Sequence, residues 1–143
     1  MSPSLVAVIA VVIAVMGVAY VINRLIALRA GLLKDTSETA ASEPVDTSDL
    51  GLSRTGPTVV HFSAVWCGPC AGVRRVVGAV CDELPEVAHV EIDMDANPEA
   101  ARRLSVLSLP TTIIFDAGGR PRYRTHGVPN AADLRSALAP LLA

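Results

Sequence analysis

Residues 66–70 read Trp-Cys-Gly-Pro-Cys, and the rest of the chain can be arranged around this stretch. The run before it, Thr58–Ala64, is apolar and rich in residues that favour strands, so it predicts a buried β-strand. From Cys67 onward the chain carries apolar side chains with helical spacing, which predicts a helix that begins at Cys67. Two cysteines separated by two residues at a strand-to-helix junction can close a small disulfide and reopen it. The sequence therefore predicts a redox-active cysteine pair.

The expected start of the helix favours Cys67 as the nucleophile of this pair. A thiol in the first turn of a helix lies near unpaired backbone N–H groups and the positive end of the helix dipole, which stabilise its thiolate. Pro69 is tolerated in the first turn because an N–H at that position has no intrahelical partner. Gly68 leaves the approach to the sulfur open. Cys70 lies one turn deeper and is better placed to resolve a mixed disulfide.

The same cysteine spacing also occurs in one half of many zinc sites. The sequence has no second pair of this kind and no closely spaced Cys/His pair downstream, so a redox pair is favoured over a metal site or an inert structural role. We expect neither a metal nor an organic cofactor. The third cysteine, Cys81, is three helical turns from Cys70, about 16 Å along the axis. That separation is too long for a disulfide, so Cys81 is expected in the core.

The wider string at residues 62–70, Phe-Ser-Ala-Val-Trp-Cys-Gly-Pro-Cys, closely resembles the active-site segment of the thioredoxin family. The resemblance extends over about residues 58–142. It implies a thioredoxin-like α/β fold, with a mixed central sheet flanked by helices. It also implies a thiol–disulfide oxidoreductase that reduces disulfide-bearing proteins through Cys67 and Cys70, with electrons from an upstream donor similar to thioredoxin reductase.

The resemblance also marks residues that would contact substrate. Pro110 resembles the cis-proline that faces the cysteine pair and presents its backbone to an extended substrate. Leu109 departs from the β-branched residue common before that proline. Gly127 resembles a glycine beside the active site, although an ordinary loop glycine is the alternative. The substrate-binding residues implied in this way are Trp66, Gly68, Pro69, Leu109, Pro110 and Gly127.

The largest departure from the family concerns two charged positions. Thioredoxins usually carry a buried aspartate beneath the second cysteine and a lysine on the next strand, and this chain has His61 and Glu91 in those places. A neutral imidazole can accept the proton of Cys70 near pH 7. Burial would disfavour the charged imidazole, and the Glu91 carboxylate would favour it. A catalytic histidine oriented by Glu91 and a purely structural histidine are both open.

The N-terminal segment Leu5–Ile22 contains no charged residue, and it accounts for much of the mean hydropathy of +0.46. As a helix it would be about 27 Å long, close to the thickness of a bilayer core. An uncleaved membrane anchor is favoured over a signal peptide, which usually has a basic start, and over a core helix. Because Arg24, Arg29 and Lys34 follow this span, we expect a single-pass protein with its catalytic domain in the cytoplasm.

We expect three parts: an anchor and juxtamembrane helix at 1–33, a linker with an abbreviated first unit of the fold at 34–56, and the thioredoxin-like domain at 57–143. The linker should be a flexible tether to about Pro44, followed by the abbreviated unit at Val45–Ser53. Within the domain, strands are expected at 87–93, 112–115 and 120–125. Helices should begin at Asn97 and Asn130.

Two other functions remain open. The opposite membrane topology would give an extracytoplasmic thiol reductant of the type that serves cytochrome maturation. A thioredoxin-like fold can also act as a binding module without enzymatic activity, but a dithiol at a helix start argues against that reading. The net charge of −2 gives no electrostatic reason to expect nucleic acid.

Overall fold

A computed structural model describes residues 3–30, 34–35 and 45–143, and the chain divides into two compact units, Met1–Ala30 and Gly31–Ala143. In the first unit, α1 (Pro3–Ala30) is one continuous helix. Its Ala7–Arg24 window has a mean hydropathy of 2.1, and it is the one helix in the described ranges that is long and apolar enough to cross a membrane. The expected N-terminal apolar helix is therefore confirmed.

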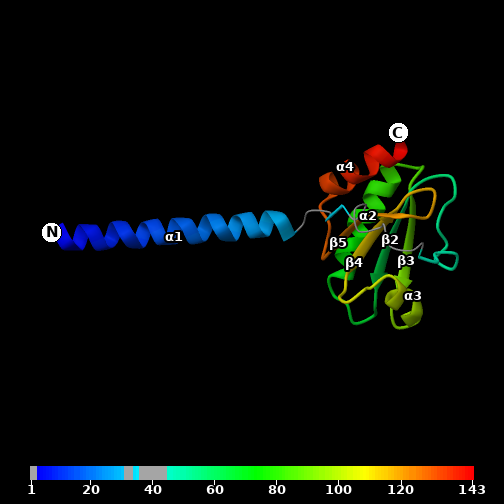
Figure 1. The fold of residues 1–143 in the computed structure, drawn as a ribbon, viewed down its shortest axis with the longest axis horizontal. Coiled ribbons are helices and arrows are strands. Elements are labelled where there is room, and N and C mark those ends of the chain that lie inside the picture. The colour runs from blue at the N-terminus through cyan, green and yellow to red at the C-terminus, as the bar shows by residue number, and fades with distance from the viewer. Residues whose placement is uncertain (1–2, 31–33, 36–44) are drawn as a thin grey trace. The chain divides into compact units, whose positions relative to one another are not determined.

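The second unit is built on a mixed sheet with the strand order β1-β5-β4-β2-β3 (Figure 1). β2 pairs in parallel with β3, whereas the β1–β5, β4–β5 and β2–β4 pairs are antiparallel. This arrangement confirms the mixed central sheet. The strands are β1 (Lys34–Asp35), β2 (Thr58–Ser63), β3 (Ala88–Asp93), β4 (Thr111–Phe115) and β5 (Pro121–His126).

Helices cover both faces of this sheet, and the alternation of side chains along β2 decides which residues meet which helix. Val59 faces α2 (Cys70–Glu83) and α4 (Ala131–Leu142), and it joins a buried cluster with side chains of both. Phe62 points to the other face, where α3 (Pro98–Arg103) completes a second cluster. Each fully buried side chain of this size stabilises the fold by about 1.5–3 kcal/mol. His61, two residues from Val59, therefore shares the face that α2 covers.

The segment before β2 differs from the expected abbreviated unit. Val45–Ser53 forms neither a strand nor a helix but a turn, in which the Leu50 N–H donates to the Thr47 carbonyl over 3.1 Å. The turn inserts Leu50, 4% exposed, into the core on the α3 face. Lys34–Asp35, which the sequence assigned to the tether, pairs with β5 through its backbone. The rest of the expected tether, residues 36–44, lies outside the described residues.

Candidate active site

Cys67 and Cys70 form a disulfide at the start of α2. The helix begins at Cys70 and not at Cys67 as expected, because Pro69 is the N-cap residue. Cys67 lies in the preceding turn, where its N–H donates to Ala64 and its carbonyl accepts from the Cys70 N–H. It is partly exposed, whereas Cys70 is 2% exposed. Cys67 thus lies on the more exposed side of the start of α2, beside the positive end of the helix dipole, and Cys70 is covered.

The side chain of Trp66, the residue before Cys67, is held in place by a hydrogen bond. Its side chain is 64% exposed, yet its indole N–H donates to Oδ2 of Asp95 over 2.9 Å. Asp95 follows β3, so the bond ties the active-site turn to the end of the neighbouring strand. Val65 and Leu107 are also exposed, at 94% and 92%. Asp95 was missed in the sequence because its role depends on the pairing of β2 with β3.

The loop before β4 is joined to the first turn of α2. The Leu109–Pro110 bond is cis, as expected, and the Pro110 carbonyl accepts a hydrogen bond of 2.9 Å from the Gly127 N–H. Gly127 has φ +78°, a conformation that favours glycine. The next residue, Val128, packs closely on Gly72 of α2. A Cβ atom at position 72 would lie 3.1 Å from a methyl group of Val128.

His61 is completely buried on the face of β2 that α2 covers. Its register partner on β3 is Glu91, and Nε2 of His61 lies 3.6 Å from Oε1 of Glu91. That nitrogen has no hydrogen-bond partner in the described part of the chain. Burial lowers the pKa of His61 to about 4, and the nearby Glu91 carboxylate offsets this effect in part. Burial therefore dominates, and His61 is neutral at pH 7.

Glu91 is held mainly by Arg74 of α2. Two guanidinium nitrogens of Arg74 donate to the carboxylate over 2.8 and 2.5 Å, and the Ser63 hydroxyl donates over 2.8 Å. The Arg74 hydrogen bonds lower the pKa of Glu91 to about 2, so it is ionised throughout the neutral range. The strand register and the 3.6 Å distance confirm that Glu91 lies near His61. The hydrogen bonds from Arg74 also fix Glu91 to α2.

A second histidine contacts His61. Nε2 of His89, on β3, lies 2.9 Å from Nδ1 of His61, and the two ring centroids are 5.0 Å apart. His89 is partly exposed, and burial lowers its pKa. The sequence analysis missed this residue. A signal was available, since His89 is two residues before Glu91 and residues at that spacing share one face of a strand.

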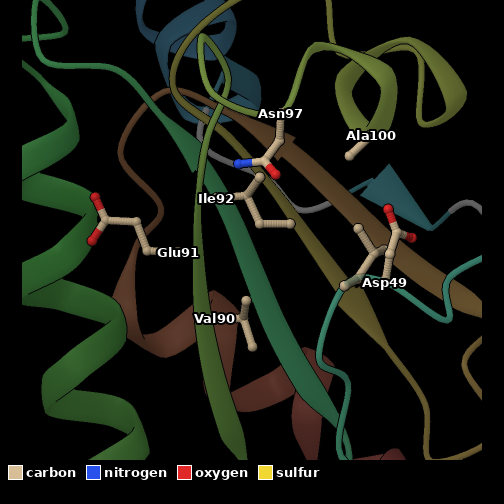
Figure 2. A pocket seen from close by; sticks show the side chains of 7 residues that line it. Asp49, Val90, Glu91, Ile92, Asn97 and Ala100 are labelled. Atoms are coloured by element: carbon tan, nitrogen blue, oxygen red, sulfur yellow. The ribbon is translucent and has the colours of Figure 1, made fainter.

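A surface pocket of about 210 Å³ lies on the other side of β3, between this strand, α3 and the Leu50 turn. Figure 2 shows the side chain of Glu91 turned away from the other lining residues, toward α2. No cysteine or histidine lines the pocket. The residues with redox and proton-transfer chemistry are therefore gathered on the α2 face.

We predict that Cys67 is alkylated faster than Cys70 in the reduced protein at pH 7. Cys67 is the exposed member of the pair and lies beside the positive end of α2, whereas Cys70 is covered. Timed iodoacetamide labelling followed by mass spectrometry measures the two rates. Faster modification of Cys70 would reverse the assignment of nucleophile and resolving thiol.

The comparisons with known proteins agree with this geometry. A family model described as Thioredoxin matches residues 47–140. A thioredoxin of Mycolicibacterium smegmatis is 35% identical over 112 residues, which cover 76% of this chain and 98% of that protein. The bifunctional thioredoxin reductase/thioredoxin of Mycobacterium leprae is 40% identical over 84 residues, 58% of this chain but 18% of that protein. The crystal structure of thioredoxin from Trypanosoma brucei brucei has a TM-score of 0.58 and 32% identity, and the match covers 69% of this chain and 88% of that one.

Proposed function

This chain belongs to the thioredoxin family and is a thiol–disulfide oxidoreductase, and from that premise we propose that it is a membrane-tethered reductant of protein disulfides whose catalytic domain faces the cytoplasm. The observation that carries the redox role is the disulfide between a partly exposed Cys67 and a covered Cys70 at the start of α2. The apolar helix α1 supports the tether.

In the proposed reaction, the Cys67 thiolate attacks one sulfur of a substrate disulfide, and the other substrate sulfur leaves with the electron pair. The product is a mixed disulfide on Cys67. Cys70 then loses its proton and attacks Cys67, which releases the second substrate thiolate and forms the Cys67–Cys70 bond. The substrate gains two electrons, and the cysteine pair supplies them. Trp66, Pro110 and Gly127 would position the substrate chain beside the sulfurs.

We further propose that His61 accepts the proton of Cys70 in the second step. His61 is neutral at pH 7 and lies on the face of the sheet that α2 covers, and Cys70 is the first residue of α2. The resolving thiol needs a base because the thiolate, and not the thiol, is the nucleophile. A base that is itself buried can act where water has little access.

An electron donor similar to thioredoxin reductase would return the Cys67–Cys70 disulfide to the dithiol. The name of the Mycobacterium leprae relative supports this partner, because it joins a thioredoxin reductase and a thioredoxin in one protein. Two electrons and two protons are needed for each turnover. A cytoplasmic location is consistent with such a donor, since that compartment is kept reducing.

The proposed orientation predicts weak labelling of Cys67 by a membrane-impermeant thiol reagent in intact cells. The reason is the basic residues Arg24, Arg29 and Lys34, which follow the apolar span and favour a cytoplasmic C-terminal side. Labelling should become strong once the cells are permeabilised. Equal labelling before and after permeabilisation would instead support the extracytoplasmic reductant.

A shortened chain that begins at Thr36 is predicted to be soluble and active on a small disulfide substrate. The contacts of the chain separate into Met1–Ala30 and Gly31–Ala143, and both hydrophobic clusters are built from residues between 50 and 142. A start at Thr36 therefore removes the short backbone pairing of β1 with β5 but none of the residues of the two hydrophobic clusters. The measurement is the turnover rate with dithiothreitol as reductant, compared with that of the full chain in detergent. A large loss of activity would contradict the independence of the catalytic unit.

A further inference from the structure

The hydrogen bond between His61 and His89 links a buried imidazole to the surface. His61 is 0% exposed and its Nδ1 lies 2.9 Å from Nε2 of His89. His89 is partly exposed on β3, the strand at the edge of the described sheet. The other nitrogen of His61, Nε2, is buried and has no hydrogen-bond partner in the residues described. One nitrogen of His61 therefore has no hydrogen-bond partner among the described residues, and the other is bonded to a second, partly exposed imidazole.

A base at this position faces a specific difficulty. If His61 took a proton at Nε2 and kept a proton at Nδ1, it would become a cation in the core, and burial strongly disfavours a charged group. The charge would be avoided if the Nδ1 proton left as the Nε2 proton arrived. Nε2 of His89 lies at hydrogen-bond distance from Nδ1 and, as a neutral imidazole nitrogen without a proton, can accept it.

We propose that His89 is a proton-relay residue that connects His61 to solvent during thiol–disulfide exchange, an inference that rests on the proposed role of His61 as the base for Cys70. In resolution, the Cys70 S–H bond breaks and an N–H bond forms at Nε2 of His61. The Nδ1 proton of His61 passes to Nε2 of His89, and His89 releases its own Nδ1 proton to water. The Cys70 thiolate displaces the substrate thiolate from Cys67, and that thiolate takes a proton from solvent. His61 stays neutral throughout.

Reduction of the disulfide runs the relay in the opposite direction. A thiolate of the dithiol donor attacks Cys67 and forms a mixed disulfide with it, and Cys70 leaves as a thiolate that takes the Nε2 proton of His61. The second donor thiol then loses its proton to solvent and displaces Cys67, which leaves the donor as a disulfide. Water protonates Nδ1 of His89, and the Nε2 proton of His89 moves to Nδ1 of His61. Both rings are then reset for the next resolution step. The relay thus gives each redox state its own pair of tautomers, with Nε2–H on His61 in the disulfide state and Nδ1–H in the dithiol state.

The groups around His61 fit the disulfide state that the structure contains. Oε1 of Glu91 lies 3.6 Å from Nε2, and an ionised carboxylate favours a proton on the nitrogen that faces it. Arg74 holds Glu91 in place from α2. From β4, the cross-strand neighbour is Thr112, which is uncharged. The Glu91 carboxylate therefore favours the Nε2–H tautomer of His61, and Nδ1 of His61 remains at hydrogen-bond distance from His89.

The tautomers can be read directly in the unaltered protein. The full chain, ¹⁵N-labelled and solubilised in detergent, is studied at pH 7 by long-range ¹H–¹⁵N correlation of its imidazoles, first as the disulfide and then after reduction with dithiothreitol. The relay predicts that the protonated nitrogen of His61 changes from Nε2 to Nδ1 on reduction. Nε2 of His89 should change at the same time from a hydrogen-bond donor to an acceptor. An unchanged His61 tautomer in the two redox states would overturn the relay.

Two variants separate the relay from the base itself. His89→Gln keeps an amide that can hydrogen-bond to His61 but cannot pass a proton on. Resolution of a preformed mixed disulfide on Cys67 should slow by at least about tenfold in this variant. His61→Asn removes the base and should slow the same step at least as much. If His61→Asn is slow and His89→Gln resolves at the wild-type rate, His89 is a structural anchor and the relay alone fails. If His61→Asn resolves at the wild-type rate, the proposed base fails and the relay fails with it.

Discussion

Cys67→Ser is expected to lower the rate of insulin-disulfide reduction by dithiothreitol to the rate without protein. A serine hydroxyl cannot form the mixed disulfide, and Cys70 is 2% exposed, so it cannot replace the exposed thiol as nucleophile. Cys70→Ser should fail at a later step. It still attacks substrate, but the mixed disulfide on Cys67 cannot be resolved internally and should accumulate, which mass spectrometry of the intact protein detects.

Cys81→Ser is the matched control for these variants. Cys81 is a free thiol in the last turn of α2, packed against the cluster between α2, α4 and the sheet. Burial raises its pKa to about 11, so it is almost entirely a thiol at pH 7. Its replacement should leave the turnover rate near that of the wild type. Equal rates for Cys67→Ser and the wild type would mean that the chain is a binding module and that the cysteine pair is incidental.

The features that the sequence predicted are those that short-range patterns determine. The strand before the cysteines and the helix after them follow from apolar runs and helical spacing, and the cis-proline before β4 was implied by the resemblance to the thioredoxin family. Even here the start of α2 was three residues too early, because a proline after Gly68 can occupy either the N-cap or the first turn. The Val45–Ser53 turn was also beyond the sequence, since its Leu50 is fixed by a tertiary contact.

The polar network around His61 could be predicted in part. The pairing of His61 with Glu91 followed from the resemblance to the thioredoxin family, in which an aspartate and a lysine occupy these two places. The strand register confirms that His61 and Glu91 are neighbours. The partners that fix these two side chains were missed. Arg74 reaches Glu91 from α2, and His89 reaches His61 from β3, so both contacts depend on how a helix and a strand meet in space. Helical or strand periodicity assigns such residues to a face but cannot name the partner across it.

His61→Ala is expected to slow the resolution of the Cys67 mixed disulfide by about 30-fold at pH 7 while leaving the initial attack nearly unchanged. Without a base, Cys70 must ionise on its own, and a thiol with an ordinary pKa of about 8.5 is about 3% thiolate at that pH. Stopped-flow measurement of substrate release from a preformed mixed disulfide isolates this step. His61→Asp should restore most of the rate because a carboxylate can also accept the proton. The further change Glu91→Lys should not help, since it would place a cation beside Arg74.

The pH dependence gives this prediction its sharpest form. Because burial lowers the pKa of His61 to about 4, the base is neutral from pH 6 to 8, and the wild-type resolution rate should be nearly flat over that range and fall only as the pH approaches 4. In His61→Ala the rate should instead rise about tenfold per pH unit, following the ionisation of Cys70. Thr112→Val is the matched control, because Thr112 is the fully buried cross-strand neighbour of His61 and the substitution nearly preserves side-chain volume. It should keep the flat wild-type profile. A flat profile at the wild-type rate in His61→Ala would show that His61 contributes packing and that Cys70 gives its proton to water.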